Sequence, residues 1–224
     1  EETDDRSLVM TSSFSTMVMV AACLPWIDDR EFLLDTCGEL GSGADRIFSE
    51  YGDMLASFGR KPFKRACFLG SDTLYGTMQE NQLKMQEMTD GKVSARFESF
   101  LGLRHGPQVF VDDSCVVIAG LASNPRVRRY EMDMLKEIRR KDQGMGTLVV
   151  CDRADAELRE ITEDIVELFP EGQKIDDQFR IMTDVAVGQI LGTFKSMSLG
   201  LKPDCPSAAG VINRVVQGVT IYES

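Results

Sequence analysis

Short apolar runs alternate with longer amphipathic stretches from about residue 65 onward. The runs at 66–70, 115–122 and 146–151 are continuous enough to predict buried strands, and the alternation over 94–100 and 164–168 predicts two more. Helical periodicity predicts helices over 73–89, 127–141, 154–162 and 177–199. Strands that alternate with helices of this length are typical of βαβ units, so we expect an α/β fold with a parallel sheet.

The first sixty residues have a different pattern, which predicts helices without strands. Thr11, Ser12 and Ser13 precede an apolar run, as hydroxyl residues do where they cap a helix N-terminus. A second helical stretch follows over 30–58. The glycines within 38–44 weaken it, so that it forms either one helix or two.

Composition narrows the possible partners. The 224 residues carry a net charge of −11, which repels nucleic acid and anionic membrane surfaces. No apolar run approaches the ~20 residues that a membrane-spanning helix needs. The six cysteines lack metal-ligand spacing and a single histidine cannot form a multi-histidine site, so we predict a cytoplasmic protein with reduced thiols, no metal and no cofactor.

The candidate chemistry lies between residues 80 and 105. Glu80, Lys84 and Glu87 have the spacing that places them on one face of a helix. They form either a solvated stripe of ion pairs or an acid–base site in which the lysine stabilises a carboxylate base and developing oxyanion charge. The lone His105 precedes Gly-Pro, which predicts a turn with either an exposed surface imidazole or a proton-transfer group.

Two further segments are candidates for binding a phosphosugar. Ser71 lies in a strand–turn–helix segment whose backbone amides could hold a phosphate, although the segment lacks the dinucleotide and P-loop fingerprints. Thr11, Ser12 and Ser13 could donate hydroxyl groups to a sugar phosphate. A plain tight turn and simple helix capping are the respective alternatives.

The segment "FLGSDTLYGTMQENQLKMQEMTDGKVSARFESFLGLRHGPQVFVDD" resembles the sugar isomerase (SIS) domain family. Together with "MTSSFS" near the start and "GVINRVVQGVTIY" near the end, it is similar to the second SIS half of tagatose-6-phosphate ketose/aldose isomerases and galactosamine-6-phosphate deaminase/isomerases. The likeness extends over nearly the whole chain. It implies a three-layer α/β/α fold with a flavodoxin-like sheet, and a homodimer or other homo-oligomer.

The resemblance also implies roles for individual residues. The glutamate at the Glu87 position is the base that moves a proton between C1 and C2 of the sugar, and the lysine matching Lys84 helps to order the site. Glu80 lies one helical turn before Lys84. The histidine matching His105 takes part in ring opening and reaches into a neighbouring subunit's site, and Thr11, Ser12 and Ser13 fall where relatives line the substrate pocket.

Three features depart from the family pattern. Asp72 stands where relatives usually have glycine, Gln217 stands where the related glucosamine-6-phosphate synthase has a lysine, and no Ser-rich phosphate loop of the first SIS half is present. We therefore expect residues 1–60 to be a linker and helices that lead from a first SIS half, residues 61–200 to be an SIS domain, and residues 201–224 to be a tail.

These observations predict an isomerase that acts on a hexose 6-phosphate through an enediol(ate) intermediate. A deaminase of an amino-sugar phosphate would use the same residues, and a non-catalytic module that only binds sugar phosphates is the third hypothesis.

Overall fold

The computed structural model describes residues 7–169, 175–214 and 218–222. Two helices come first, α1 (Ser12–Cys23) and α2 (Arg30–Gly59), joined by the 3-10 turn η1 (Leu24–Trp26). Strands and helices then alternate: β1 (Arg65–Leu69), α3 (Thr73–Met88), β2 (Ser94–Glu98), α4 (Phe100–Arg104), the 3-10 turn η2 (Pro107–Phe110), β3 (Cys115–Gly120), α5 (Pro125–Arg140), β4 (Gly146–Cys151), α6 (Ala156–Ile161), β5 (Ile165–Glu167) and α7 (Asp177–Ser198).

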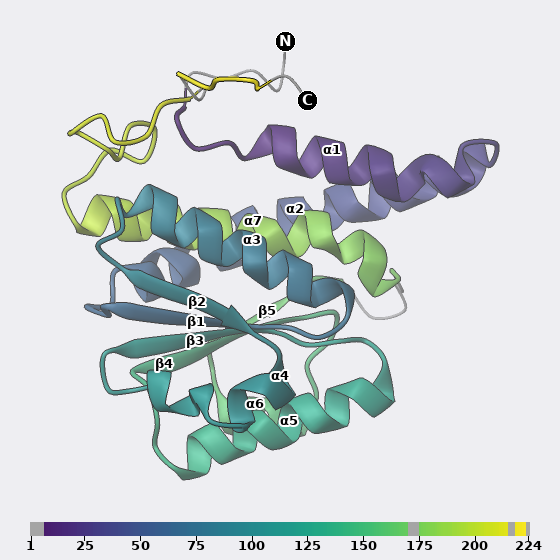
Figure 1. Cartoon of the computed structure of the whole chain (residues 1–224). Coiled ribbons are helices and arrows are strands. Elements are labelled where there is room, and N and C mark those ends of the chain that lie inside the picture. Colours follow the sequence, from purple (N-terminus) through teal and green to yellow (C-terminus); the bar gives the residue numbers. More distant parts are fainter. Residues whose placement is uncertain (1–6, 170–174, 215–217, 223–224) are drawn as a thin grey trace.

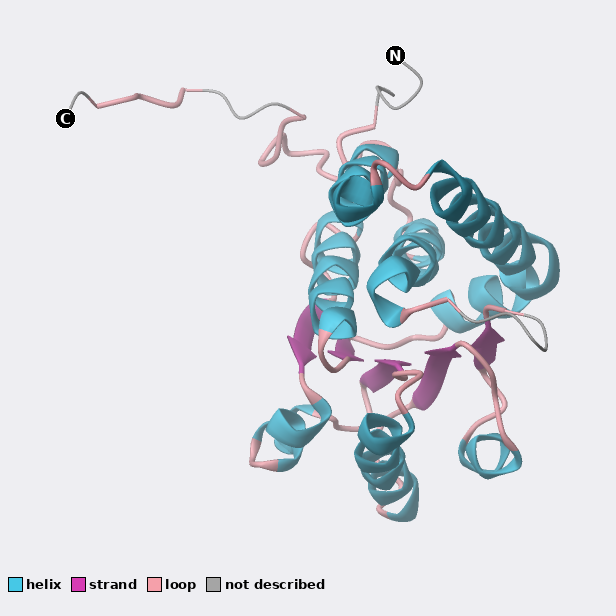
Figure 2. Ribbon diagram, turned by 90° about the vertical axis from the view of Figure 1, so that its right-hand side faces the viewer, coloured by secondary structure: helices cyan, strands magenta, loops and turns pink. Residues whose placement is uncertain are grey.

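The five strands form one parallel sheet in the order β2-β1-β3-β4-β5. Helices cover both faces, with α2, α3 and α7 on one side and α4, α5 and α6 on the other, while α1 lies outermost beside α7 (Figures 1 and 2). The predicted three-layer α/β/α sandwich with additional N-terminal helices is confirmed. The order of the strands is that of flavodoxin-like sheets, with the switch point between β1 and β3.

Alternate residues of each strand supply the two cores of the sandwich. In β1, Phe68 packs into the core beneath α2, α3 and α7, whereas Cys67 and Leu69 pack into the core beneath α4, α5 and α6. Every residue of β3 is buried, as the continuous apolar run predicted for a strand that is covered on both faces.

The second helix is continuous, which decides between the two possibilities that its glycines left open. Gly43 lies on the buried face of α2, where a Cβ atom would stand 2.8 Å from Cε1 of Phe169. The glycine is thus a point of close packing and does not break the helix. Asp29 caps this helix by accepting the Phe32 N–H at 3.0 Å.

Two predicted details are wrong. The strand predicted over 94–100 ends at Glu98, because the Ser99 hydroxyl oxygen accepts the Gly102 N–H at 3.0 Å and so begins α4. Thr11 is the N-cap residue of α1, but its side chain makes no capping hydrogen bond.

Helices α3 and α7 pack closely because α7 has glycines at positions 188 and 192. A Cβ atom at Gly188 would collide with the Asn81 side chain, and one at Gly192 would stand 2.7 Å from the Met88 sulfur. This close approach covers the face of α3 that carries Asn81, Lys84, Met85 and Met88, all of which are buried.

Candidate active site

Glu80, Lys84 and Glu87 form a compact cluster on α3, as their spacing predicted. The Lys84 ammonium donates a hydrogen bond to Glu87 Oε2 at 2.7 Å and lies 3.3 Å from Glu80 Oε1. One cation therefore bridges two carboxylates that are about two helical turns apart.

Lys84 at the centre of the cluster is buried, so the cluster is not a fully solvated stripe of ion pairs. The side chain of Lys84 is 5% exposed and that of Glu80 is 11% exposed, whereas Glu87 is 31% exposed. Burial raises the pKa of Glu80, the nearby Lys84 opposes that rise, and Glu87 adds to it. The arrangement leaves Glu87 as the carboxylate that a bound molecule can reach, held in place by an inaccessible ammonium group.

The hydroxyl residues at the start of α1 lie on the same side of the sheet as this cluster. Thr11 lines a cavity of about 550 Å³ together with residues of α2 and α7, including Gln189 and Thr193. The Thr193 hydroxyl lies 3.8 Å from the sulfur of Met88, the residue after Glu87. Thr193 therefore touches both the cavity and the C-terminal end of α3, although no residue of α3 is among those that line the cavity. Ser13 donates its hydroxyl to the Met10 sulfur at 3.2 Å, and Ser12 is exposed.

Ser71 lies elsewhere, at the carboxyl edge of the sheet, roughly 20 Å along α3 from Glu87. Its hydroxyl interacts with the carboxyl group of Glu131. Burial raises the pKa of Glu131, and the hydrogen bonds from Ser71 and the Ala122 N–H partly offset that rise. Glu131 Oε2 accepts that N–H at 2.8 Å.

A second carboxylate occupies the same edge of the sheet. Asp177 Oδ2 accepts the Ser123 N–H at 2.8 Å, and its Oδ1 accepts from the buried Arg180 at 2.8 Å. The amides that follow β3 at the switch point are thus occupied by side chains of the chain itself. Asp72 has φ 50°, in the region that glycine adopts most readily.

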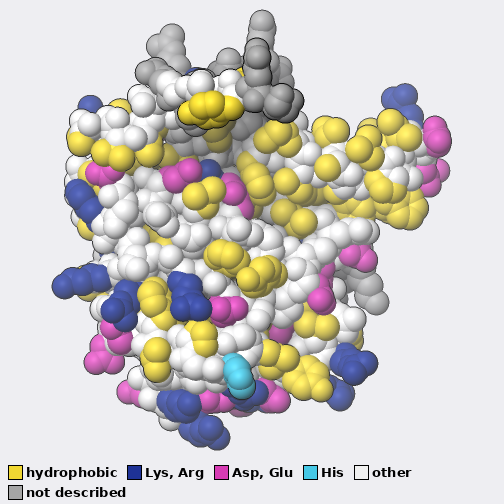
Figure 3. Space-filling model, in the orientation of Figure 1, with side chains coloured by type: hydrophobic (Ala, Val, Ile, Leu, Met, Phe, Trp, Pro, Cys, Tyr) yellow, Lys and Arg dark blue, Asp and Glu magenta, His cyan; other side chains and the backbone are white. Residues whose placement is uncertain are grey.

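His105 is exposed at the C-terminus of α4, on the opposite side of the sheet from α3 (Figure 1). The histidine, cyan in Figure 3, lies at the surface of the layer formed by α4 and α5. The turn predicted from Gly-Pro is present, with Gly106 at φ 133°. Within one chain the structure therefore brings Glu80, Lys84 and Glu87 together, with Thr11 on their side, and leaves Ser71 and His105 apart from them.

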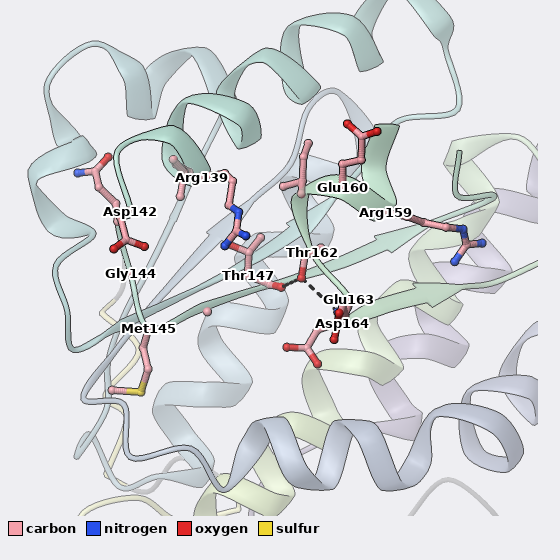
Figure 4. A pocket seen from close by; sticks show the side chains of 14 residues that line it. Arg139, Asp142, Gly144, Met145, Thr147, Arg159, Glu160, Thr162, Glu163 and Asp164 are labelled. Carbon is pink, nitrogen blue, oxygen red and sulfur yellow. Dashed lines mark hydrogen bonds between the residues drawn. The ribbon is translucent and has the colours of Figure 1, made fainter. Parts of the chain in front are cut away.

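A different cavity, of about 390 Å³, lies at the amino edge of the sheet between the ends of α5 and α6 (Figure 4). Its wall includes Thr162, which donates its hydroxyl to the Thr147 carbonyl at 2.6 Å, and Asp164, which pairs with Lys61 at 3.0 Å. None of the residues that the sequence singled out lines this cavity, so we do not assign the site to it.

Asn81 is a buried polar residue that the sequence reasoning missed. Its amide donates to the Asp184 carbonyl at 3.3 Å, while its Oδ1 has no hydrogen-bond partner among the described residues. The signal that could have indicated it is Gly188-x-x-x-Gly192 in a predicted helix. Small residues four positions apart let two helices approach closely, and Gly188 packs against Asn81.

Gln217, which stands in place of a lysine, lies outside the described residues. Among the described residues, no group of three or more His, Cys, Asp or Glu side chains could hold a metal ion. No helix in this part of the chain combines the length and the apolar character needed to cross a bilayer.

The described residues thus form an α/β domain with a parallel flavodoxin-like sheet and a carboxylate–lysine–carboxylate cluster on α3. The chain is 34% identical over 227 aligned residues to the D-galactosamine-6-phosphate deaminase AgaS of Escherichia coli, covering 99% of this chain and 56% of that protein. The chain thus spans about half the length of the curated relatives it matches. No protein-family model matches it.

Two solved structures share the fold in detail. A Clostridium novyi protein, provisionally named a tagatose-6-phosphate ketose/aldose isomerase, superposes with a TM-score of 0.94 at 28% identity, covering 100% of this chain and 57% of that one. The tagatose-6-phosphate ketose/aldose isomerase of Escherichia coli superposes with a TM-score of 0.80 at 31% identity, covering 91% of this chain and 54% of that one. The chain is therefore a relative of these deaminases and isomerases, and the predicted resemblance is confirmed.

Proposed function

We propose that this chain carries the acid–base residues of a phosphosugar enzyme that acts on an open-chain hexose 6-phosphate. Glu87 removes the proton from the carbon next to the carbonyl group, and an enediol(ate) forms. The observation that carries this proposal is the burial of Lys84 between two carboxylates, which leaves Glu87 both anchored and accessible.

Each residue has a distinct part in this mechanism. Lys84 keeps the Glu87 carboxylate in one position and offsets negative charge that develops on the substrate in a poorly solvated environment. Thr11, Ser12 and Ser13 contribute hydroxyl groups to the sugar. His105 moves the ring-opening proton in the site of a second subunit, because in its own chain the sheet separates it from α3.

Two reactions fit these residues. Aldose–ketose interconversion needs proton transfer between C1 and C2, and release of ammonia from an amino-sugar phosphate begins with the same chemistry. The relative named as a galactosamine-6-phosphate deaminase supports the second reaction, and the structures named as tagatose-6-phosphate isomerases support the first. We propose a homodimer that acts in the cytoplasm in either case.

The phosphate site is part of the same proposal. Because carboxylates of the chain occupy the amides after β3, we infer that the edge around Ser71 does not hold the phosphate group. The division into residues 1–60, 61–200 and 201–224, in which a first SIS half supplies the phosphate loop, stays a prediction.

The test is Glu87→Gln in the natural protein, with two assays run in parallel. Ammonia release from galactosamine 6-phosphate and interconversion of tagatose 6-phosphate separate the two reactions. We expect the variant to lose turnover and to keep the wild-type circular dichroism spectrum. The matched control is Glu50→Gln, which removes an exposed partner of Arg46 on α2. Unchanged turnover of Glu87→Gln would remove Glu87 from the mechanism.

A further inference from the structure

The turn that carries His105 is attached to α5 on both of its sides. Before the turn, Arg104 Nε donates to Glu137 Oε2 at 2.7 Å. After the turn, Gln108 Oε1 accepts from Lys141 Nζ at 3.4 Å, and the same ammonium donates to Glu137 Oε1 at 2.7 Å. A continuous chain of hydrogen bonds thus connects Arg104, before His105, to Gln108, after it, and Glu137 stands at its centre.

Further contacts anchor both ends of this chain of bonds. Arg104 Nη2 also donates to the Asp133 carbonyl at 3.4 Å, and Gln108 Nε2 donates to Gln143 Oε1 at 2.8 Å. Gln108 is buried although it follows an exposed turn. Arg104 and Gln108, which flank the segment from His105 to Pro107, are therefore held in place by side-chain hydrogen bonds. The imidazole itself stays at the surface.

The electrostatics favour a permanently charged centre. Lys141 first, and Arg104 second, lower the pKa of Glu137 to about 2. Ion pairs near the surface contribute little to stability. Two cations on one carboxylate, each at 2.7 Å, do however restrict the orientation of all three side chains.

The local backbone cannot orient the turn alone. Gly106 and Pro107 fix its shape, with the Val109 N–H donating to the Gly106 carbonyl at 3.3 Å. The preceding helix α4 has only five residues, and isolated helices of that length are unstable. The tilt of α4 and the turn relative to α5 therefore depends on side-chain contacts between them.

We propose that Glu137 is a positioning residue for His105. Its carboxylate holds Arg104 and Lys141, and through them it fixes the direction in which the imidazole projects from the α4–α5 surface. The inference rests on the proposed role of His105, and it adds a requirement on a residue that touches neither the substrate nor the imidazole.

The test uses Glu137→Gln, which keeps the shape of the side chain and removes its charge. The imidazole resonances of His105 are identified by their loss in His105→Asn. We expect the heteronuclear NOE of the backbone amides to fall at 104, 105, 106, 108 and 109, with sharper imidazole lines. Turnover should fall by about tenfold in kcat while KM changes by less than about twofold, because a displaced catalytic group lowers kcat.

Four further variants make the result specific. Glu137→Asp retains the charge and should recover part of both readouts, whereas Glu50→Gln should change neither. Lys141→Gln should lower kcat less than Glu137→Gln does. The double variant Lys141→Gln/Glu137→Gln should have the kcat of Glu137→Gln, because the two substitutions act through the same chain of hydrogen bonds.

The positioning role would be overturned if Glu137→Gln kept the wild-type NOE values, or if it kept the wild-type kcat while His105→Asn was inactive. Either result would leave the proposed function standing. Full turnover by His105→Asn would instead remove His105 from the proposed function, and the positioning role with it.

Discussion

Replacement of Lys84 by methionine tests whether the cluster on α3 is a buried charge site. Methionine keeps the length and apolar character of the lysine stem and removes the ammonium group that bridges Glu80 and Glu87. Glu80 then remains 11% exposed without its cation, and Glu87 loses its anchor.

The magnitude follows from the burial of the three groups. Removing one partner of a buried ion pair costs about 3–5 kcal/mol, because the other charge stays buried without compensation. Glu87 is 31% exposed and is partly solvated, so the lower end applies, about 3 kcal/mol. For a chain of this length that corresponds to a decrease of roughly 6–12 °C in Tm.

Thermal unfolding followed by circular dichroism at pH 7 measures this effect. Lys84→Met/Glu80→Gln should recover part of the loss, because a neutral amide is less costly to bury than a carboxylate. The matched control is Lys136→Met, which should leave Tm unchanged. The Lys136 side chain is 42% exposed and forms a 2.6 Å ion pair with Glu157 at the surface. A Lys84→Met variant as stable as this control would refute the buried cluster and the reasoning built on it.

Two further predictions concern packing and pH. Gly188→Ala should lower the free energy of unfolding by about 1–3 kcal/mol, because the added methyl group meets the Asn81 side chain. Gly76→Ala, which has open space around the added methyl group, should raise the free energy of unfolding by about 1 kcal/mol. Urea denaturation measures both, and equal effects of the two substitutions would contradict the close α3–α7 contact. The low pKa of Glu137 should stabilise the fold above its ordinary value of 4.5, and that stabilisation is lost as pH falls through about 2. The Tm difference between wild type and Glu137→Gln should therefore shrink over this range, and a constant difference would show that the ion pairs are absent.

The fold was predictable because its signals are local. The apolar run over 115–122 required a strand covered on both faces, and the helix over 73–89 carried its own periodicity. The boundaries were less predictable. The Ser99 hydroxyl group ended the strand predicted through Phe100, and α2 runs unbroken through Gly43, where Phe169 packs closely.

The sequence by itself determined that Glu80, Lys84 and Glu87 share a helix face, since that follows from helical spacing alone. It also determined that His105 lies on a turn, since Gly-Pro permits little else. Only the tertiary structure decided that Lys84 is buried, because this depends on how closely Gly188 and Gly192 let α7 approach. It likewise decided that the sheet separates His105 from α3, because the position of a helix above or below a sheet depends on the connections between strands and not on the residues within the helix.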